Sequence, residues 1–225
     1  MTKLKTLAAA AALVASGLAS ATTTLNTAYF SVTYDETTTF GTVSSWFTSG
    51  LGTGFEWSVS SDVNVTSVGG VLASATFAIP DFTITANSGY VLSGDFLSTL
   101  GNIVYAQNGA ATLSIKANAT VTVDGGVPNV FLDAPLQQFV VTPSFGHFAG
   151  TSGVSPVGTF NSVTVSGASI TLSAEGGSFA MIGGQPQNKL SFSFAAQPVP
   201  EPESYALMLA GLGLVGLLAR RRRQG

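Results

Sequence analysis

The chain has 225 residues, of which 11 are acidic and eight are lysine or arginine, so its formal net charge is −3, and it contains no cysteine. The absence of cysteine excludes disulfides, thiolate metal sites and a cysteine nucleophile. The length is sufficient for one domain that depends on its own hydrophobic core.

The first 21 residues have the pattern of a secretory signal peptide. Lys3 and Lys5 precede a short apolar run, and Ala19 and Ala21 frame a small-x-small cleavage pattern. A positive flank, an apolar core and a small-residue exit together are typical of such peptides. We therefore expect a signal peptide helix over residues 1–21, removal by signal peptidase, and a mature chain that begins near Thr22.

Residues 22–199 are more acidic than the whole chain suggests. They contain nine carboxylate side chains but only two lysines, Lys116 and Lys189, so the net charge of this span is −7. A domain with that charge repels phosphate, which argues against nucleic acid as a partner. The span also has no arginine, the residue that best grips anionic ligands.

Between residues 22 and 198 the sequence predicts an all-β extracytoplasmic domain. Leu190, Phe192 and Phe194 alternate with serines, and residues 111–117 and 169–173 alternate in the same way. Alternation places apolar side chains on one face of each strand. Many short strands separated by turns favour an antiparallel β-sandwich, jelly-roll-like, or a barrel. A β-helix is disfavoured because no fixed-period repeat occurs.

Glycine clusters mark the expected turns between these strands. They lie at Gly69-Gly70, Asp124-Gly125-Gly126, Gly176-Gly177 and Gly183-Gly184. Glycine adopts positive φ without steric cost, as tight hairpin turns require. We expect a hairpin between residues 111–117 and 117–126, and further hairpins over residues 169–182 and 183–194. Residues 93–109 could instead form a short helix, with Ser93 or Asp95 as its N-cap.

Few residues of the domain suit catalysis. His147 is the only histidine, and no G-x-S-x-G pattern accompanies it. Paired carboxylates, as glycosidases use, could come from Asp35, Glu36, Glu56, Asp62 and Asp81, but their spacing selects no pair. The sequence therefore predicts that the protein is not an enzyme.

Metal and sugar binding are weaker alternatives. Asp35, Glu36, Asp62, Asn64 and Asp124 offer oxygen ligands for a weak calcium site, although no contiguous calcium loop occurs. No other metal or cofactor is expected. Trp46 and Trp57 are the only two tryptophans; Trp57 alternates like a core residue, whereas Trp46 is the candidate carbohydrate contact.

The C-terminal stretch differs in composition from everything before it. It begins with a short motif of Val199, Pro200, Glu201 and Pro202. An uncharged run over residues 205–219 follows. The run ends at a basic cluster of four arginines, Arg220, Arg221, Arg222 and Arg223.

The uncharged run has the character of a short membrane anchor. Fifteen helical residues span about 22 Å, less than the roughly 30 Å of a bilayer core. Arginines at the end of such a helix stay on the cytoplasmic side of the membrane. We therefore predict a transmembrane helix over residues 205–219 as a transient anchor, with the arginine cluster as its basic end.

This arrangement resembles the PEP-CTERM sorting signal, with the Val-Pro-Glu-Pro motif, the apolar span and the basic end in order over residues 199–225. The resemblance implies recognition by an exosortase-type enzyme, removal of the tail, transient anchoring in the inner membrane of a Gram-negative bacterium, and delivery to the cell surface or matrix. It also implies an association with exopolysaccharide and biofilm.

Two functions of different classes remain open. The first is a structural or adhesive protein of the surface or biofilm matrix, without catalytic activity. The second is an extracellular carbohydrate-binding module, assisted by calcium and using Trp46; a secreted glycosidase is a third and weaker reading.

Overall fold

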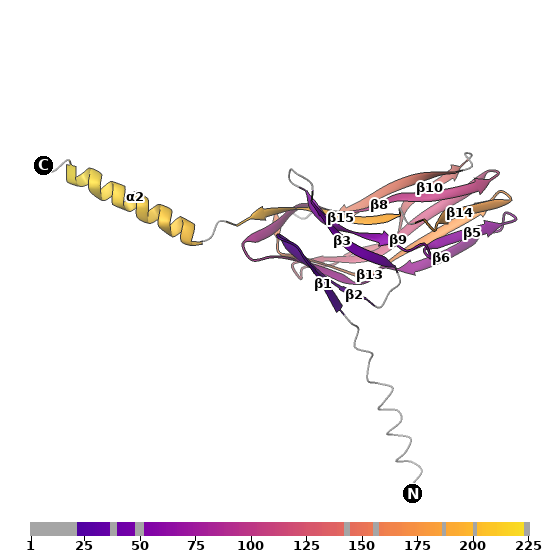
Figure 1. The fold of residues 1–225 in the computed structure, drawn as a ribbon, viewed down its shortest axis with the longest axis horizontal. Helices are drawn as coiled ribbons and strands as arrows, with labels where there is room; N and C mark the ends of the chain where they lie inside the picture. Colours follow the sequence, from indigo (N-terminus) through magenta and orange to yellow (C-terminus); the bar gives the residue numbers. More distant parts are fainter. Residues whose placement is uncertain are drawn as a thin grey trace, which may run out of the picture.

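The computed structural model describes residues 22–36, 40–47, 52–141, 145–154, 158–185, 188–199 and 202–222. These residues form fifteen β-strands followed by one helix, α2 (Pro202–Arg222). Figure 1 shows the strands gathered in one elongated body, with α2 projecting from one end. The predicted signal peptide, with Ala19 and Ala21, lies outside the described residues.

The strands form two sheets, and the first has seven strands. Its spatial order is β1-β2-β7-β13-β9-β10, with β6 also paired to β13. Its members are β1 (Thr22–Asn26), β2 (Phe30–Asp35), β6 (Ala73–Ala78), β7 (Phe82–Ala86), β9 (Ala111–Val123), β10 (Asn129–Val141) and β13 (Ser162–Gly176).

The second sheet has eight strands. Its order is β3-β4-β15-β8-β14-β5, with β11 and β12 also paired to β8. Its members are β3 (Gly41–Phe47), β4 (Thr53–Val59), β5 (Asn64–Val68), β8 (Tyr90–Asn108), β11 (Phe145–Val154), β12 (Thr159–Phe160), β14 (Phe179–Gly183) and β15 (Lys189–Pro198).

Every ladder between the described strands is antiparallel, which confirms the all-β antiparallel prediction. Neither sheet closes on itself within the described residues, because β1 and β10 end the first order and β3 and β5 end the second. The barrel alternative was therefore wrong. The jelly-roll connection order stays a prediction.

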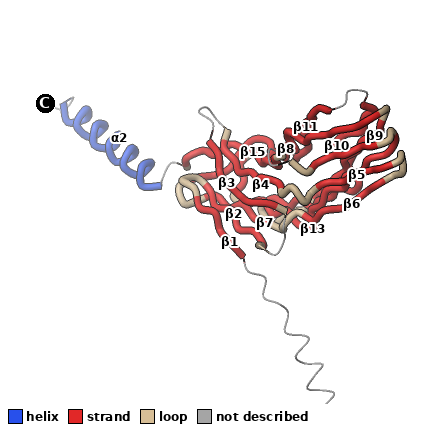
Figure 2. Tube along the Cα trace, turned by 45° about the vertical axis from the view of Figure 1, so that its right-hand side comes forward, coloured by secondary structure: helices blue, strands red, loops and turns tan. Residues whose placement is uncertain are grey.

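The core lies between the two sheets, which Figure 2 shows as two layers of strands. Rings from opposite sheets meet edge to face. The centroids of Phe30 and Phe194 are 4.9 Å apart, and those of Phe55 and Phe82 are 5.3 Å apart. Trp57 is fully buried beside Phe82. Such contacts add to the hydrophobic stabilisation from area burial.

The alternation seen in the sequence places these side chains. In β15, Leu190, Phe192 and Phe194 point into the core, whereas Ser191 and Ser193 lie on the outer face. The same alternation holds over residues 111–116 of β9 and over residues 168–174 of β13. The strand period therefore assigned the correct face to these segments.

The glycine turns occur where they were expected, and two of them meet a further turn, at Gly109, at one end of the molecule. Gly70 accepts a hydrogen bond from the Gly176 amide, and Ser178 donates to the Asn108 carbonyl at 2.8 Å. Gly69, Gly70, Gly109, Gly176 and Gly177 all have positive φ. Because a Cβ on Gly177 would lie 2.5 Å from the Asn108 oxygen, this packing requires glycine.

The helix proposed for residues 93–109 was wrong, since this segment belongs to β8. Leu92, Phe96 and Leu100 are buried at intervals of four, a spacing that suits a helix face and a strand face equally. Pairing with β15 on one side and β11 and β12 on the other decides for the strand. Long-range hydrogen bonds thus override an ambiguous local pattern.

The expected hairpins also need correction. Residues 111–123 form one continuous strand, β9, which pairs with β10 on one side and β13 on the other. The turn at Asp124–Gly126 instead joins β9 to β10, which pair directly. Strands β13 and β14 are adjacent in sequence but belong to different sheets, and β14 and β15 each pair with β8 rather than with one another.

Candidate functional site: the end of the domain and the helix beyond it

The last strand of the domain leads directly into the C-terminal segment. β15 lies inside the second sheet between β4 and β8, and its last pair is Pro198 with Tyr90. The Val199 amide then donates to the Gly89 carbonyl at 2.8 Å. Pro200 and Glu201 lie outside the described residues, and α2 begins at Pro202. The hydrogen bonds of the domain therefore end at the first residue of the Val-Pro-Glu-Pro motif.

Helix α2 is longer than the predicted 205–219 span. It has 21 residues, or about 31 Å at the usual rise. Pro202 suits a first helical turn because its missing N–H has no intrahelical partner there. Among the described residues, no helix combines the length and apolarity needed to cross a membrane.

The helix continues through the basic cluster, whereas the membrane span over residues 205–219 stays a prediction. Arg220, Arg221 and Arg222 form the last turn of α2, whereas Arg223 lies outside the described residues. Arginine is a good helix former, and a cation in the last turn complements the negative end of the helix dipole. The arginines therefore extend the helix instead of ending it.

The apolar side chains of α2 that the structure describes, over residues 206–215, face solvent. Leu207 is 74% exposed and Leu212 is 62% exposed, and every other side chain described between residues 206 and 215 is exposed as well. Figure 1 shows the helix standing away from both sheets. None of the described side chains of α2 belongs to the domain core or packs against it.

Residues 198–223 match the model of the PEP-CTERM protein-sorting motif. The chain carries a PEP-CTERM sorting motif. The motif implies an exported protein that an exosortase processes. The match contains all the predicted motif and basic residues: Val199, Pro200, Glu201, Pro202, Arg220, Arg221, Arg222 and Arg223. A search of curated proteins finds no match to this chain.

The PEP-CTERM motif leaves the β domain without an assigned site, so the candidate residues there are judged by their surroundings. Trp57 is fully buried between the sheets, which confirms that it is a core residue. Trp46 belongs to β3 and lies opposite Gly54 in register. Its side chain is outside what the structure describes, so the carbohydrate role of Trp46 stays a prediction.

A cavity of about 360 Å³ opens near two of the candidate carboxylates. Its lining consists of Tyr34, Asp35, Glu36, Gly41, Thr42, Val43, Trp57 and Pro80. Tyr34 packs edge to face on Trp57, with ring centroids 6.1 Å apart. Burial, followed by the nearby negative charge of Glu36, raises the pKa of the Tyr34 hydroxyl above its usual value.

Sequence reasoning named Asp35 and Glu36 but missed the rest of this cavity. Tyr34 precedes them directly and could have been included. Pro80 could not, because it reaches the cavity from the connection between β6 and β7, more than forty positions along the chain.

Two other candidate carboxylates have structural partners. Asp124 accepts hydrogen bonds from the amides of Asn161 at 2.8 Å and Ser162 at 2.7 Å, which fixes the start of β13 beside the β9–β10 turn. Asp81 accepts from the Gly167 amide at 2.8 Å, where β13 is irregular. Both carboxylates stabilise local backbone geometry.

Two remaining calcium candidates, Asp62 and Asn64, flank the turn between β4 and β5. The Asp62 amide donates to Ser60 Oγ, and Asn64 Nδ2 donates to the Ser61 carbonyl at 2.9 Å. Within the described ranges, no three His, Cys, Asp or Glu side chains gather as metal ligands usually do. The weak calcium site therefore stays a prediction.

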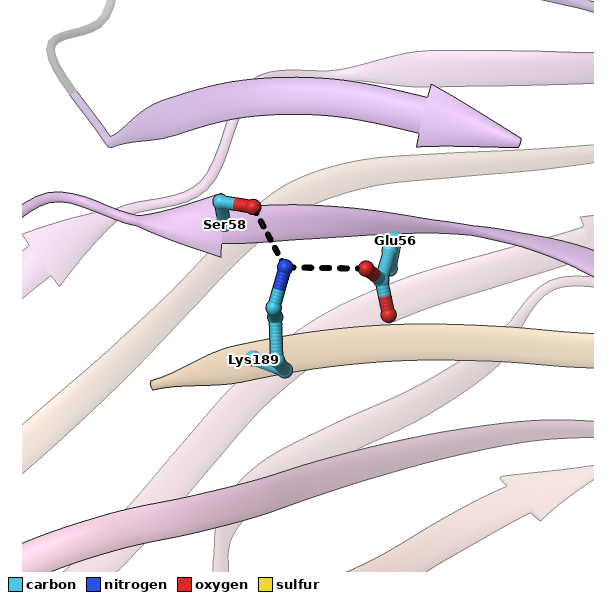
Figure 3. A network of polar contacts seen from close by, with 3 residues as sticks. All are labelled: Glu56, Ser58 and Lys189. Atoms are coloured by element: carbon cyan, nitrogen blue, oxygen red, sulfur yellow. Dashed lines mark hydrogen bonds and ion pairs between the residues drawn. The ribbon is translucent and has the colours of Figure 1, made fainter. Parts of the chain in front are cut away.

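Glu56 forms an ion pair on the outer face of the second sheet, shown in Figure 3. Lys189 Nζ lies 2.9 Å from Glu56 Oε1 and 2.6 Å from Ser58 Oγ. Lys189 of β15 is opposite Ser58 of β4 in register, so Glu56 is its diagonal neighbour. A carboxylate held by a lysine in this way joins two strands and is poorly placed as one of a catalytic pair.

His147 is exposed on β11, opposite Val104 of β8. Its neighbour Phe145 is also exposed. Among the residues that the structure describes, no hydrogen bond or ion pair orients the His147 ring as a general base requires.

Proposed function

We propose that this chain is an exported protein of the cell surface or biofilm matrix, with a β domain that has a structural or adhesive role and no catalytic activity. The PEP-CTERM motif at residues 198–223 carries the export part of this proposal. Cleavage within the motif would leave the whole domain intact, since its last sheet hydrogen bond is made by Val199.

The exposed apolar side chains of α2 support transient anchoring in the inner membrane. With the cluster from Arg220 to Arg223 on the cytoplasmic side, the span predicted over residues 205–219 would hold residues 22–199 outside. The 15 uncharged residues supply the apolar part of this anchor, and the basic side chains at its end can snorkel to the membrane surface.

The proposed structural role is supported by the contacts of the polar side chains in the domain. Of the candidate carboxylates, Glu56, Asp81 and Asp124 have partners that hold the fold together. The outer faces carry hydroxyl pairs across strands, such as Thr76 with Thr171 at 2.8 Å. These contacts stabilise the sheets and supply neither a nucleophile nor an oriented base.

The experiment is an intact-mass measurement on the protein made by its own host. We expect a species that begins near Thr22 and ends close to Pro200–Glu201. A triple variant, Pro200→Ala, Glu201→Gln and Pro202→Ala, should retain the tail and stay with the membrane. Gln197→Ala, just upstream, serves as the control and should be processed normally. Surface protein that retains the arginine cluster would overturn the sorting proposal.

The cavity beside Asp35 and Glu36 supports a second candidate, the carbohydrate-binding module. Its volume of about 360 Å³ lies within the range of small-ligand sites, and its lining combines the aromatic Tyr34 and Trp57 with carboxylates, a mixture that suits a sugar. A pull-down with the host exopolysaccharide, with and without calcium, tests this candidate. Binding should fall in Glu36→Gln and Trp46→Ala; sugar release during the same incubation would contradict the absence of catalysis.

A further inference from the structure

Two turns of the domain meet at the residue where the sorting motif begins. The turn between β1 and β2 contains Ala28 and Tyr29, and the turn between β7 and β8 contains Ser88 and Gly89. The Val199 amide donates to the Gly89 carbonyl at 2.8 Å. We call the surface that these turns form with the first residue of β8 the exit face; it consists of Ala28, Tyr29, Ser88, Gly89 and Tyr90.

Hydrogen bonds and a ring contact hold the two turns together. The Asn87 amide donates to the Tyr29 carbonyl at 3.0 Å, and Asn87 Nδ2 donates to the Thr27 carbonyl at 2.8 Å. The rings of Tyr29 and Tyr90 pack edge to face, with centroids 5.1 Å apart. The exit face is therefore a fixed surface, made of segments that lie far apart in the sequence.

The sorting motif is held next to the exit face. β15 lies between β4 and β8, and its pairing with β8 continues to Pro198, opposite Tyr90. Only two residues separate Val199 from α2, which begins at Pro202. Because three Cα-to-Cα steps span at most about 11 Å, the whole motif stays within that distance of Val199. Figure 1 shows α2 leaving the body from the end where β15 stops.

An enzyme that binds the motif also reaches the exit face. The motif implies processing by an exosortase, so this enzyme must bind the chain at the motif. The first motif residue, Val199, is hydrogen-bonded to Gly89, and Ser88 beside it is exposed. The two turns are thus the part of the domain nearest to the bound segment. The exit face is therefore continuous with a surface that the enzyme occupies.

The composition of the exit face suits contact with a protein. Its five residues are uncharged, although residues 22–199 carry a net charge of −7. Ala28, Ser88 and Gly89 are exposed, and Tyr29 and Tyr90 are half-buried. Tyrosine is enriched in protein interfaces, whereas charged residues are depleted at their centres. A ring that already packs on a neighbouring ring loses little conformational freedom when a partner binds.

We propose that the exit face is a second contact surface for the exosortase, so that the enzyme recognises the folded end of the domain together with the Val-Pro-Glu-Pro motif. The exit-face residues position the motif and take no part in the cleavage itself. This inference rests on the processing proposed above and names the domain surface that contributes to it. A sorting signal read by itself would be processed at a rate that does not depend on these turns.

The rate of tail removal in the host tests this inference, with the full chain followed by pulse-chase and its products identified by intact mass. The double variant Ala28→Gln, Ser88→Gln adds uncharged bulk to both turns of the exit face. We expect tail removal to become about tenfold slower, a usual loss when contacts of an interface are disturbed. An unchanged urea denaturation midpoint of the variant domain excludes unfolding as the cause.

A matched control places the same side chains at the other end of the domain. Val71 and Leu72 are 69% and 59% exposed in the turn after β5. This turn lies near Asn108, the last residue of β8, whereas the exit face lies at the first. Val71→Gln, Leu72→Gln should therefore keep the wild-type rate of tail removal.

An inserted linker distinguishes contact from obstruction. A Gly-Ser-Gly-Ser insertion between Pro198 and Val199 leaves the motif unchanged but moves it away from the exit face. We expect this insertion to slow tail removal by a similar factor, and the double variant Ala28→Gln, Ser88→Gln to have no additional effect in its presence. Faster removal after the insertion would mean that the domain obstructs the enzyme, and would overturn the inference.

The remaining outcomes separate this inference from the sorting proposal. Equal rates in the wild type, the exit-face variant and the insertion would mean that the motif is read alone, or that the exit face contacts lipid instead of the enzyme. Either result would overturn this inference and leave the sorting proposal intact. A wild type that retains its tail would overturn both.

Discussion

Many leucine and valine side chains are buried in the β domain, whereas those described in α2 are exposed. In the domain, Leu113 and Val163 are fully buried between the sheets, whereas in α2 Leu207 and Val215 are exposed by 74% and 65%. The same side chains therefore stabilise a fold in one region and form part of a sorting segment in the other. The difference lies in partners: the described apolar side chains of α2 are exposed, whereas those of the domain pack on one another.

Core truncation should show the largest contrast between the two regions. Trp57→Ala removes a fully buried ring that packs on Phe55, Phe82 and Phe192. We expect a loss of about 3–5 kcal/mol in the free energy of unfolding, measured by urea denaturation. Leu212→Ala in α2 is the matched control and should leave the unfolding midpoint unchanged. Equal effects of the two substitutions would mean that α2 packs on the domain.

Glycine packing where the turns at Gly70, Gly109 and Gly177 meet should give the next largest effect. Gly177 has φ +64° and a Cβ there would lie 2.5 Å from the Asn108 oxygen, so Gly177→Ala adds a clash to backbone strain. We expect a loss of about 2–4 kcal/mol by thermal unfolding.

Gly125→Ala isolates the clash, because Gly125 has a similar φ of +66° but open space around it. This control should cost about 1–2 kcal/mol, the usual penalty of the left-handed conformation alone. If the two variants unfold at the same temperature, the three glycine turns do not interlock as described.

The turn at Asp124 should show a smaller effect. Asp124→Ala removes two amide hydrogen bonds and places alanine at φ 47°, so we expect a loss of about 1–3 kcal/mol by urea denaturation. Asp124→Asn should recover most of it, because asparagine keeps an acceptor oxygen and tolerates this conformation. A loss in Asp124→Asn as large as in Asp124→Ala would show that the negative charge itself is required.

The two regions also differ in how far sequence alone predicted them. The sorting motif was predicted from residues 199–225 because its elements are contiguous and keep their order. The strand faces of β9, β13 and β15 were predicted for the same reason, since alternation is a local property. The extension of α2 to Pro202 and through Arg221 to Arg222 was missed because charged residues were taken as its limits.

Strand pairing was harder to predict because it depends on residues far apart in the chain. A helix was offered as an alternative for residues 93–109, although β8 pairs with partners from four other strands. Residues 117–126 were expected to pair with the preceding residues 111–117. The turn at Asp124 was recognised, but it leads to β10, the strand that pairs with β9. The cavity beside Asp35 is lined in part by Pro80, which lies in the connection between β6 and β7, far from Asp35 in the sequence. No local pattern encodes such contacts.

The ion pair on the outer face should give the smallest effect and thus test whether the polar faces contribute to stability. Lys189 and Glu56 are 32% and 26% exposed in their side chains, so water weakens their attraction. Glu56→Gln keeps an oxygen acceptor, and Lys189 keeps Ser58 at 2.6 Å. We expect a loss of about 0.2–1 kcal/mol in urea denaturation at low salt, which disappears in about 1 M NaCl because salt screens exposed charges. Ser191→Ala, on the same face of β15, is the control and should show no salt dependence. A loss in Glu56→Gln comparable to that in Trp57→Ala would show that this pair, like the core, holds the two strands together.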